Sequence, residues 1–376
     1  MSNVFSPTPL FERVERARRR KHKFRDTQIT LAHGSGGRAM HELIEGLFLE
    51  YLRNPLLEKL EDQAVFEIPD KIAANGNGHT QNRIAFTTDS YVVDPIFFPG
   101  GDIGKLAING TVNDLAMSGA RPLYLSAGFI LEEGFPIEDL KRILASMRDA
   151  AAEAGVAVVT GDTKVVQKGS ADKLFINTSG IGVIESPINL SATRAQPGDK
   201  VILSGTVGDH GTTIMIARGE LELETDIESD TAPLNSLVRE MLDEAASASA
   251  VDSIHCMRDP TRGGAATTLN EIALSSEVYI EIDEELIPVR EEAKGACEIL
   301  GLDPLYVANE GKLIAIVSSD IAERLVDRMK HNRYGRDACI IGRVKAEPQG
   351  IVAMRTGFGG TRIVDMLVGE QLPRIC

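Results

Sequence analysis

The sequence predicts a mixed α/β (α+β) protein built from two domains. From Ile29 onward, short apolar runs punctuated by glycine alternate with amphipathic stretches, the pattern of a chain that combines sheets with helices. The 376 residues correspond to two domains, at about 150 residues each. Apolar residues make up 43% of the chain and charged residues 25%, a composition that excludes disorder for the bulk of the protein.

Residues 1–28 form a basic N-terminal extension that precedes this pattern. Eight lysine and arginine residues fall between Arg13 and Arg25. Because acidic Glu12, Glu15 and Asp26 are interspersed among them, we expect a solvated, partly helical segment. A docking arm and an organelle presequence remain alternatives.

Residues 29–190 are predicted to form the first, N-terminal domain. The expected elements are a strand at 84–93, a helix at 102–118, a strand at 122–131, a helix at 136–153, a buried strand at 156–159 that ends at residues 160–162, and a strand at 173–184. Asp89 falls in the first of these strands and Asp114 in the first helix, so the two carboxylates are expected on adjacent elements.

Residues 191–350 are predicted to form a second α/β domain, with a linker at 192–200 that contains Pro197 and Gly198. We expect strands at 201–204, 278–282, 312–318 and 338–344, and helices at 212–219, 234–249 and 263–274. Residues 351–376 then form a terminal strand, a glycine cluster and a short tail that ends in Cys376.

Charge and cysteine content narrow the possible partners and location. The formal net charge of −15 argues against broad attraction to nucleic acid or anionic membranes, and no apolar run approaches the ~20 residues of a membrane span. Cys256, Cys297, Cys339 and Cys376 form no Cys-x-x-Cys pair, which argues against a zinc knuckle or a disulfide framework. No signal peptide is recognised at the N-terminus, so we expect a cytoplasmic protein. The first three cysteines are expected to fill the core.

Two glycine-rich loops and a set of aspartates indicate a nucleotide site. Residues 34–37 and 205–211 expose backbone N–H groups as phosphate-binding loops do, but neither has the spacing of a P-loop or of a dinucleotide fingerprint. Asp62, Asp89, Asp114 and Asp259 stand at the ends of apolar segments. Each alone fits a helix cap or a turn; together they suit Mg²⁺ that bridges nucleotide phosphates.

Eight segments, in order along the chain, resemble the HypE family of hydrogenase maturation carbamoyl dehydratases. They are His33–Gly37, Thr87–Pro95, Gly100–Ala116, Gly161–Val166, Gly208–Gly211, Asp259–Gly264, Asn309–Gly311 and the terminal Pro373–Cys376. The resemblance covers the chain from about Ile29 to its end. It does not include the basic extension, for which it implies no role.

The resemblance implies a PurM-like architecture, shared with aminoimidazole ribonucleotide synthetase, selenophosphate synthetase and thiamine-monophosphate kinase, with a mobile C-terminal tail and a homodimer formed through the first domain. It further implies that Cys376 accepts a carbamoyl group from HypF, that ATP with Mg²⁺ drives dehydration to a thiocyanate, and that the cyano group passes to a HypC–HypD complex for the iron site of [NiFe] hydrogenase.

The expected site residues come from the matched segments and, for Asp62, from the set of aspartates described above. Cys376 carries the substrate, and Lys164 and Glu310, as an ion pair, are candidates for proton removal. ATP and its metal are expected at Asp62, Asp89, Asp114 and Asp259, with further ATP contacts at Gly36, Gly37, Asn113, Asp162 and Arg262. His33 and His210 are either ligand contacts or ordinary loop histidines.

Two alternative functions stay open at this point. A selenophosphate synthetase shares the acidic cluster but carries its reactive cysteine or equivalent near the N-terminus, where this chain has none. A non-catalytic carrier or scaffold would present Cys376 to other maturation proteins without turning over ATP.

Overall fold

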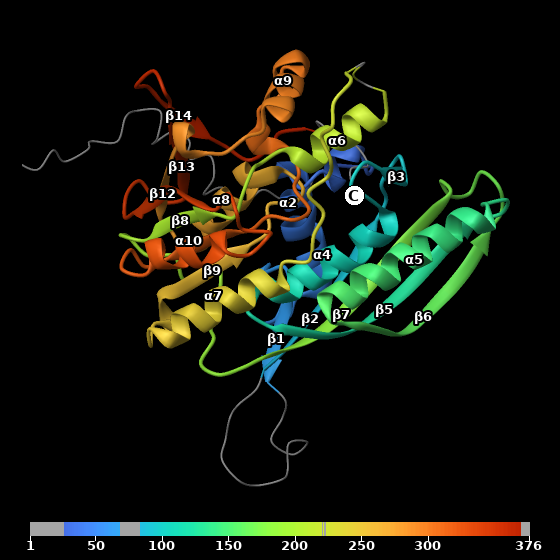
Figure 1. The fold of residues 1–376 in the computed structure, drawn as a ribbon, viewed down its shortest axis with the longest axis horizontal. Coiled ribbons are helices and arrows are strands. Elements are labelled where there is room, and N and C mark those ends of the chain that lie inside the picture. The colour runs from blue at the N-terminus through green and yellow to red at the C-terminus, as the bar shows by residue number, and fades with distance from the viewer. Residues whose placement is uncertain (1–25, 68–82, 220, 222, 370–376) are drawn as a thin grey trace, which may run out of the picture.

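Two β-sheets organise the computed structural model, which describes residues 26–67, 83–219, 221 and 223–369. The first sheet has the strand order β1-β2-β7-β5-β6. Its strands are β1 (Ala64–Glu67), β2 (Arg83–Tyr91), β5 (Arg121–Glu132), β6 (Ala157–Val166) and β7 (Leu174–Ile184). Only the β5–β6 pair is parallel, and the helices α4 (Ile103–Met117) and α5 (Ile137–Ala154) cover one face (Figure 1).

The second sheet has the order β14-β13-β10-β12-β8-β11-β9. Its strands are β8 (Lys200–Leu203), β9 (Ile254–Arg258), β10 (Tyr279–Asp283), β11 (Ile314–Val317), β12 (Cys339–Lys345), β13 (Ile351–Arg355) and β14 (Thr361–Val364). Five α-helices of the described chain lie between the strands of this sheet in the sequence. They are α6 (Asp209–Ala217), α7 (Asn235–Ser247), α8 (Gly264–Ser275), α9 (Glu291–Leu300) and α10 (Ala322–Lys330).

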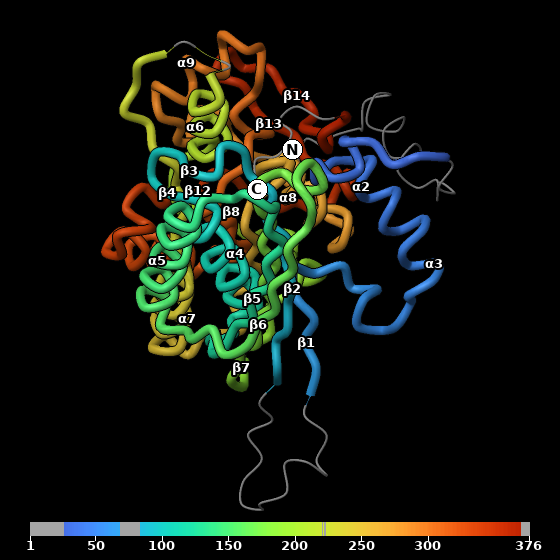
Figure 2. Tube along the Cα trace, turned by 90° about the vertical axis from the view of Figure 1, so that its right-hand side faces the viewer, coloured from blue at the N-terminus to red at the C-terminus, as the bar shows by residue number. Residues whose placement is uncertain are grey.

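Shorter elements complete the described chain. They are η1 (Leu31–Gly34), α2 (Arg38–Leu43), η2 (Ile44–Phe48), α3 (Leu49–Leu52), η3 (Leu57–Lys59), β3 (Phe97–Phe98), β4 (Gly101–Asp102), η4 (Val251–Ser253), η5 (Glu284–Leu286) and η6 (Pro304–Tyr306). The helices α2 and α3 project from the body beside β1 and β2 (Figure 2). They precede the first sheet in the sequence, yet α2 is bonded to α8 and to the chain after β14.

Helix α4 joins the two halves of the molecule. It packs on β2 and β7 of the first sheet and also contacts α7 and β9. Leu115, Ala116 and Met117 at its C-terminal end belong to one apolar cluster with residues of α7, β8, β9 and β11. Because both faces of this helix are covered, 13 of its 15 residues are buried, and its polar side chains are held at the centre of the fold.

Most of the predicted elements are present, with shifts of a few residues at their ends. The helix α6 begins at Asp209 rather than at residue 212, because Gly208 stands before it at φ +86°. The elements that the sequence analysis did not predict include α2, α3, α9, α10, β3, β4, β9 and β14. The predicted domain limits (29–190, 191–350 and 351–376) stay predictions, although residues 185–199 do separate the strands of the two sheets.

The expectation of a buried strand at 156–159 is wrong. The strand β6 starts at Ala157, continues to Val166, and is exposed along nearly its whole length. Val158 and Val159 are 44% and 59% exposed, because β6 is an edge strand that pairs only with β5. Tyr124 and Ile181 on neighbouring strands are also exposed, so among the described residues this sheet carries apolar side chains that the rest of the chain leaves uncovered. Among the described residues, no helix combines the length and apolar character needed to cross a membrane.

Candidate functional site

The four predicted aspartates line one pocket of about 390 Å³ between the two halves of the molecule. Asp62 precedes β1, Asp89 lies in β2, Asp114 lies on α4, and Asp259 follows β9. The pairing of β1 with β2 brings the first two elements together, and Thr87 of β2 donates a hydrogen bond of 2.8 Å to Asp114. Met40, His41 and Ile44 of the N-terminal helical segment form another wall.

Arg258, which the sequence did not single out, organises the carboxylates on one side of this pocket. It is 9% exposed, and its guanidinium lies 2.6 Å from Asp62, 2.8 Å from Glu271 and 3.8 Å from Glu61. Glu271 also contacts His41 at 2.7 Å, which ties α2 to α8. A single buried arginine thus offsets part of the charge of three carboxylates.

The pocket remains strongly acidic despite Arg258. Burial raises the pKa of Asp259 to about 6, opposed by Arg258 and assisted by Asp89. Burial also raises the pKa of Asp114 well above its usual value, and the charges of Asp259, Asp89 and Asp62 raise it further. The pKa of Asp62 is raised in the same way, mainly by burial, against the attraction of Arg258. This mutual repulsion is what a bound cation relieves.

The described residues hold no group of three His, Cys, Asp or Glu side chains already arranged around a metal ion. The aspartates therefore share a pocket without forming a complete metal cage. This arrangement fits Mg²⁺, which usually takes one or two protein carboxylates and completes its shell with phosphate oxygens and water. The donor set, all carboxylate oxygen, is also the type that Mg²⁺ prefers.

The glycine loop at residues 34–37 closes the pocket and contacts the C-terminal segment. Gly36 has φ +75°, and a Cβ there would lie 2.5 Å from the carbonyl oxygen of Arg262. A Cβ on Gly37 would lie 2.4 Å from the carbonyl oxygen of Leu367, which accepts a hydrogen bond of 2.9 Å from the Arg38 N–H. Only glycine fits between these two backbones, so the last described residues of the chain run beside the pocket.

Arg262 spans the opening between this loop and the first sheet. Its guanidinium donates a hydrogen bond of 3.1 Å to the Gly34 carbonyl and lies 3.9 Å from Asp89. Of the predicted ATP contacts, Gly36 and Arg262 therefore line the pocket with the aspartates, while Gly37 supports its wall.

Asn113 and Asp162 do not line this pocket. Asn113 is buried on α4 and bonds to the backbone of the second half, where it accepts the N–H of Leu234 at 2.8 Å and donates to the carbonyl oxygens of Ala232 and Glu310 at 3.0 and 3.4 Å. Asp162 is exposed on β6. Their predicted contact with ATP stays a prediction.

Glu310 and Lys164, the two proton-transfer candidates, lie in contrasting surroundings. Glu310 is 4% exposed, in the loop before β11. Glu310 does not itself line the acidic pocket. Its carbonyl accepts a hydrogen bond of 3.4 Å from Asn113, whose neighbour on α4, Asp114, does line the pocket. Lys164 is on the exposed edge strand and pairs with Asp162 at 2.5 Å. The expected ion pair between Lys164 and Glu310 is therefore not formed within one chain.

The histidine and cysteine candidates that the structure describes lie outside the acidic pocket. His33 is buried and contacts Thr30 and Asp26, and His210 is fully buried and contacts Ser229 at 2.7 Å. Cys256 and Cys297 are buried, as expected of core residues, and Cys339 is partly buried. Cys376 lies outside the described residues, as does most of the basic extension.

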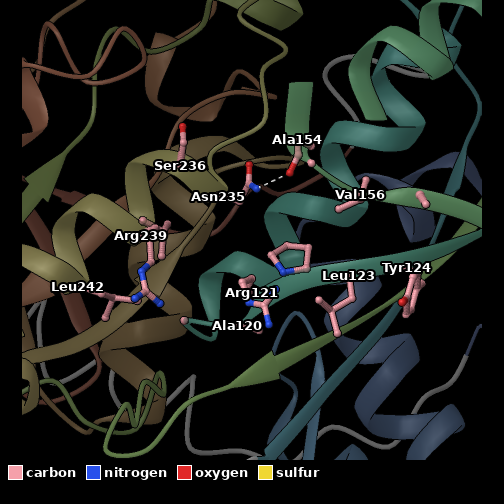
Figure 3. A pocket seen from close by; sticks show the side chains of 15 residues that line it. Ala120, Arg121, Leu123, Tyr124, Ala154, Val156, Asn235, Ser236, Arg239 and Leu242 are labelled. Atoms are coloured by element: carbon pink, nitrogen blue, oxygen red, sulfur yellow. Dashed lines mark hydrogen bonds between the residues drawn. The ribbon is translucent and has the colours of Figure 1, made fainter. Parts of the chain in front are cut away.

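A second cleft, at the junction of β5, β6 and α7, lacks the chemistry of the first. Its lining includes Arg121, Tyr124 and Arg239 but no aspartate or glutamate (Figure 3). It contains none of the predicted site residues, so the acidic pocket is the better candidate for a metal and nucleotide.

Comparison with known proteins agrees with this geometry. The family described as "AIR synthase related protein, N-terminal domain" matches residues 60–184, and its C-terminal counterpart matches residues 196–355. The carbamoyl dehydratase HypE of Azotobacter vinelandii is 55% identical over 352 residues, which are 94% of this chain and 98% of that protein. The chain belongs to the HypE family. It is therefore a hydrogenase maturation protein of a carbamoyl dehydratase family, with the PurM-like fold that the sequence predicted.

Solved structures of HypE extend the likeness to three dimensions. A crystal structure of a HypE–HypF complex matches with a TM-score of 0.78 at 50% identity, covering 86% of this chain and 99% of that chain. HypE in complex with ATP matches with a TM-score of 0.74 at 50% identity, covering 93% of this chain and 100% of that chain. Membership in a family of carbamoyl dehydratases favours the dehydratase over the selenophosphate synthetase, which is another kind of enzyme, and over the non-catalytic carrier.

Proposed function

We propose that this protein uses Mg²⁺ and ATP in the acidic pocket to dehydrate an S-carbamoyl group on Cys376 to an S-cyanate. The observation that carries the proposal is the convergence of four carboxylates from both halves of the molecule on a pocket beside which the C-terminal segment runs. That a related HypE has been crystallised with ATP supports the choice of nucleotide.

The chemistry requires a leaving group and a base. The carboxamide oxygen attacks the γ-phosphorus of ATP, so that an O–P bond forms and ADP leaves. The C–O bond then breaks and the oxygen leaves as part of inorganic phosphate. The nitrogen loses both of its protons, and the C–N bond becomes the triple bond of a nitrile. Overall, one S-carboxamide and one ATP give one S-cyanate, ADP, phosphate and a proton.

The pocket residues divide this work. Mg²⁺, when bound, would supply charge neutralisation for the phosphates, and Asp62, Asp89, Asp114 and Asp259 are the residues that would hold it. Arg258 keeps Asp62 oriented through its ion pair. Arg262 and the backbone at Gly36 border the same pocket and would contact the nucleotide.

The length of the tail is compatible with delivery of Cys376 to this pocket. Ser35 donates a hydrogen bond of 3.2 Å to the carbonyl of Gly369, which fixes the chain beside the glycine loop. The seven residues that follow can extend at most about 25 Å, at roughly 3.3–3.6 Å each. We therefore expect a tail of this length to let Cys376 reach the same pocket.

Proton removal is assigned to Glu310, with Lys164 as a second candidate. Glu310 is buried, its backbone is bonded to Asn113 beside the pocket residue Asp114, and a carboxylate is one of the groups that can act as a general base. Lys164 is exposed on β6. It would contact a substrate only if a second protein chain packed against that edge strand and presented the substrate there.

A homodimer would place a second chain there if it formed through the face of the first sheet that α4 and α5 do not cover. Val159 and Val165 on β6 are 59% and 67% exposed, a pattern that a second copy would cover. HypF is the proposed carbamoyl donor, since a related HypE is known in a complex with HypF, and HypC–HypD is the proposed acceptor of the cyano group. The cytoplasmic location stays a prediction.

The test is a comparison of nucleotide binding with turnover. Asp89→Ala and Asp114→Ala should abolish Mg²⁺-dependent ATP binding in calorimetry. Glu310→Gln should retain ATP binding, but its C-terminal peptide should no longer lose one water after incubation of the carbamoylated protein with ATP. Unchanged affinity in both aspartate variants would place the ATP site elsewhere.

A further inference from the structure

The backbone of the loop that carries Glu310 is hydrogen-bonded at the N–H and C=O of Glu310 and at the N–H of Gly311. The Glu310 carbonyl accepts hydrogen bonds from the Ala232 N–H at 3.3 Å and from the Asn113 side chain at 3.4 Å. Its N–H donates to Asp230 at 3.0 Å. The next residue, Gly311, lies so close to the 230–232 segment that a Cβ would be 1.8 Å from the Asp230 carbonyl oxygen.

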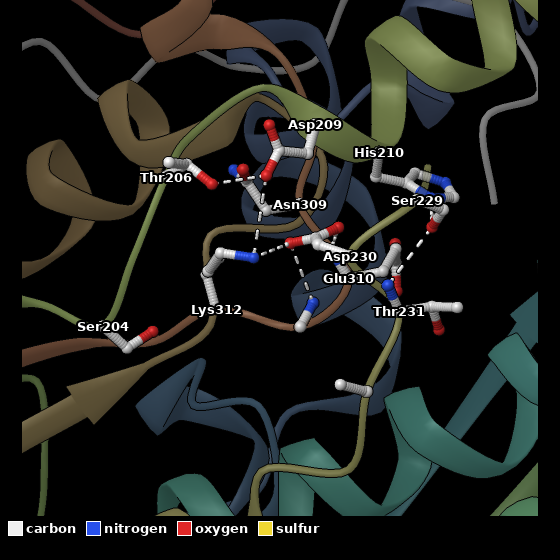
Figure 4. A network of polar contacts seen from close by, with 12 residues as sticks. Ser204, Thr206, Asp209, His210, Ser229, Asp230, Thr231, Asn309, Glu310 and Lys312 are labelled. Carbon is white, nitrogen blue, oxygen red and sulfur yellow. Dashed lines mark hydrogen bonds and ion pairs between the residues drawn. The ribbon is translucent and has the colours of Figure 1, made fainter. Parts of the chain in front are cut away.

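Asp230 is the centre of this arrangement. Its two carboxylate oxygens accept separate N–H groups, from Glu310 at 3.0 Å and from Gly311 at 3.2 Å (Figure 4). The oxygen that accepts from Gly311 also lies 3.0 Å from the Lys312 ammonium. The side chain of Asp230 is only 2% exposed, so these bonds do not compete with water.

Lys312 balances the buried charge of this network. It lies 3.9 Å from Asp209 as well as 3.0 Å from Asp230, and Thr206 donates to Asp209 at 2.5 Å. Lys312, with the charge of His210 and the hydrogen bond from the Glu310 N–H, holds the pKa of Asp230 below its usual value against the effect of burial. Asp230 therefore stays ionised and accepts both backbone N–H groups.

Asn113 connects the same loop to the acidic pocket. It bonds to the Glu310 carbonyl, and its neighbour on α4, Asp114, lines the pocket. The Glu310 backbone is thus fixed on one side by Asp230 and on the other by the helix that supplies a proposed metal ligand. These hydrogen bonds hold the backbone of Glu310 in place. They therefore fix the position of its Cα and limit the positions that its carboxylate can reach.

We propose that Asp230 is the positioning residue for Glu310, an inference that rests on the proposed role of Glu310 in proton removal. Asp230 does not itself line the acidic pocket. It acts by holding the Glu310 and Gly311 N–H groups, so that the glutamate carboxylate meets the carboxamide nitrogen. Loss of this hold should slow the dehydration step and leave ATP binding intact.

The experiment measures single-turnover dehydration at saturating ATP, on protein carbamoylated with cyanate, by the mass of its C-terminal peptide. Asp230→Asn keeps the shape of the side chain but can accept only one of the two N–H groups. We expect its rate to fall about tenfold or more, as small displacements of reacting groups do, with an unchanged ATP dissociation constant.

Asp209→Asn is the matched control. It removes the same charge from the same network around Lys312. The side chain of Asp209 contacts Thr206, Arg290 and Lys312 but bonds to neither the Glu310 nor the Gly311 N–H, and Asp209 does not line the acidic pocket. We expect its rate to stay within about threefold of the unmodified protein. A purely electrostatic or structural role of the network would make the two variants equally slow, which would overturn the inference.

A charge-neutral pair covers the case in which Asp230→Asn fails to fold. Asp230→Asn with Lys312→Met removes both buried charges together, a change that buried ion pairs often tolerate. If this double variant dehydrates at the unmodified rate while Glu310→Gln is inactive, Asp230 is not a positioning residue. If Glu310→Gln itself retains the unmodified rate, the proposed role of Glu310 fails, and the inference fails with it.

Discussion

Asp259→Asn should stabilise the ligand-free protein while it weakens Mg²⁺-dependent ATP binding. Asp259 is buried in the pocket that Asp62, Asp89 and Asp114 also line, and its pKa is about 6, against about 3.9 in an unfolded chain. The native state therefore binds the Asp259 proton more tightly than the unfolded state does. In the window between these two values, stability from this group falls as pH rises.

The magnitude follows from the size of that displacement. A difference of about two pKa units at about 1.4 kcal/mol each corresponds to about 2–3 kcal/mol of free energy of unfolding lost at neutral pH. Asparagine has nearly the same shape and carries no charge, so it avoids this loss. The variant should equal the unmodified protein near pH 4 and exceed it by about 2 kcal/mol near pH 8.

Urea unfolding in EDTA at about pH 4 and about pH 8 measures both values. Asp252→Asn is a suitable control, because Asp252 is 85% exposed on η4 and should change stability by less than about 0.5 kcal/mol. A variant that is less stable than the unmodified protein at pH 8, or whose advantage is the same at both pH values, would refute the electrostatic reasoning.

Three further predictions concern the glycine loop, the exposed sheet and the tail. Gly36→Ala, at φ +75° and against Arg262, should lower stability by about 1–3 kcal/mol and weaken ATP binding, whereas Gly34→Ala, with nothing within 4 Å, should do neither; calorimetry and thermal unfolding decide. Val159→Asp should shift the protein to a monomer in size-exclusion chromatography, whereas Ile299→Asp on α9 should not; equal elution of both would argue against the sheet as the dimer interface. Cys376→Ala should change the free energy of unfolding by less than about 0.5 kcal/mol and bind ATP normally, yet accept no carbamoyl group from HypF by mass spectrometry; carbamoylation at another cysteine would contradict the tail mechanism.

The sequence by itself determined the class of fold and the chemical type of the site. Periodicity and glycine punctuation located most strands and helices because these are local properties of the chain. The sequence also contains a local signal for α10, because Ala322, Leu325, Val326 and Met329 have helical spacing and form its buried face. For β9 the local signal is weaker, because His255 and Arg258 interrupt its apolar residues although the strand is buried.

Only the tertiary structure decided which residues meet. Asp62 and Asp259 are almost 200 positions apart, and nothing local indicates that Arg258 joins Asp62 to Glu271. The exposure of β6 depends on its being an edge strand of the first sheet, which its apolar sequence does not reveal.

The same limit applies to Glu310. Its motif is visible in the sequence, but its position depends on Asp230, 80 residues earlier, and on Asn113, 197 residues earlier. Side-chain type and local spacing specify what chemistry a residue can perform. Which charges it faces, and how firmly it is held, depend on contacts between distant segments, and these form only when both sheets pack around α4.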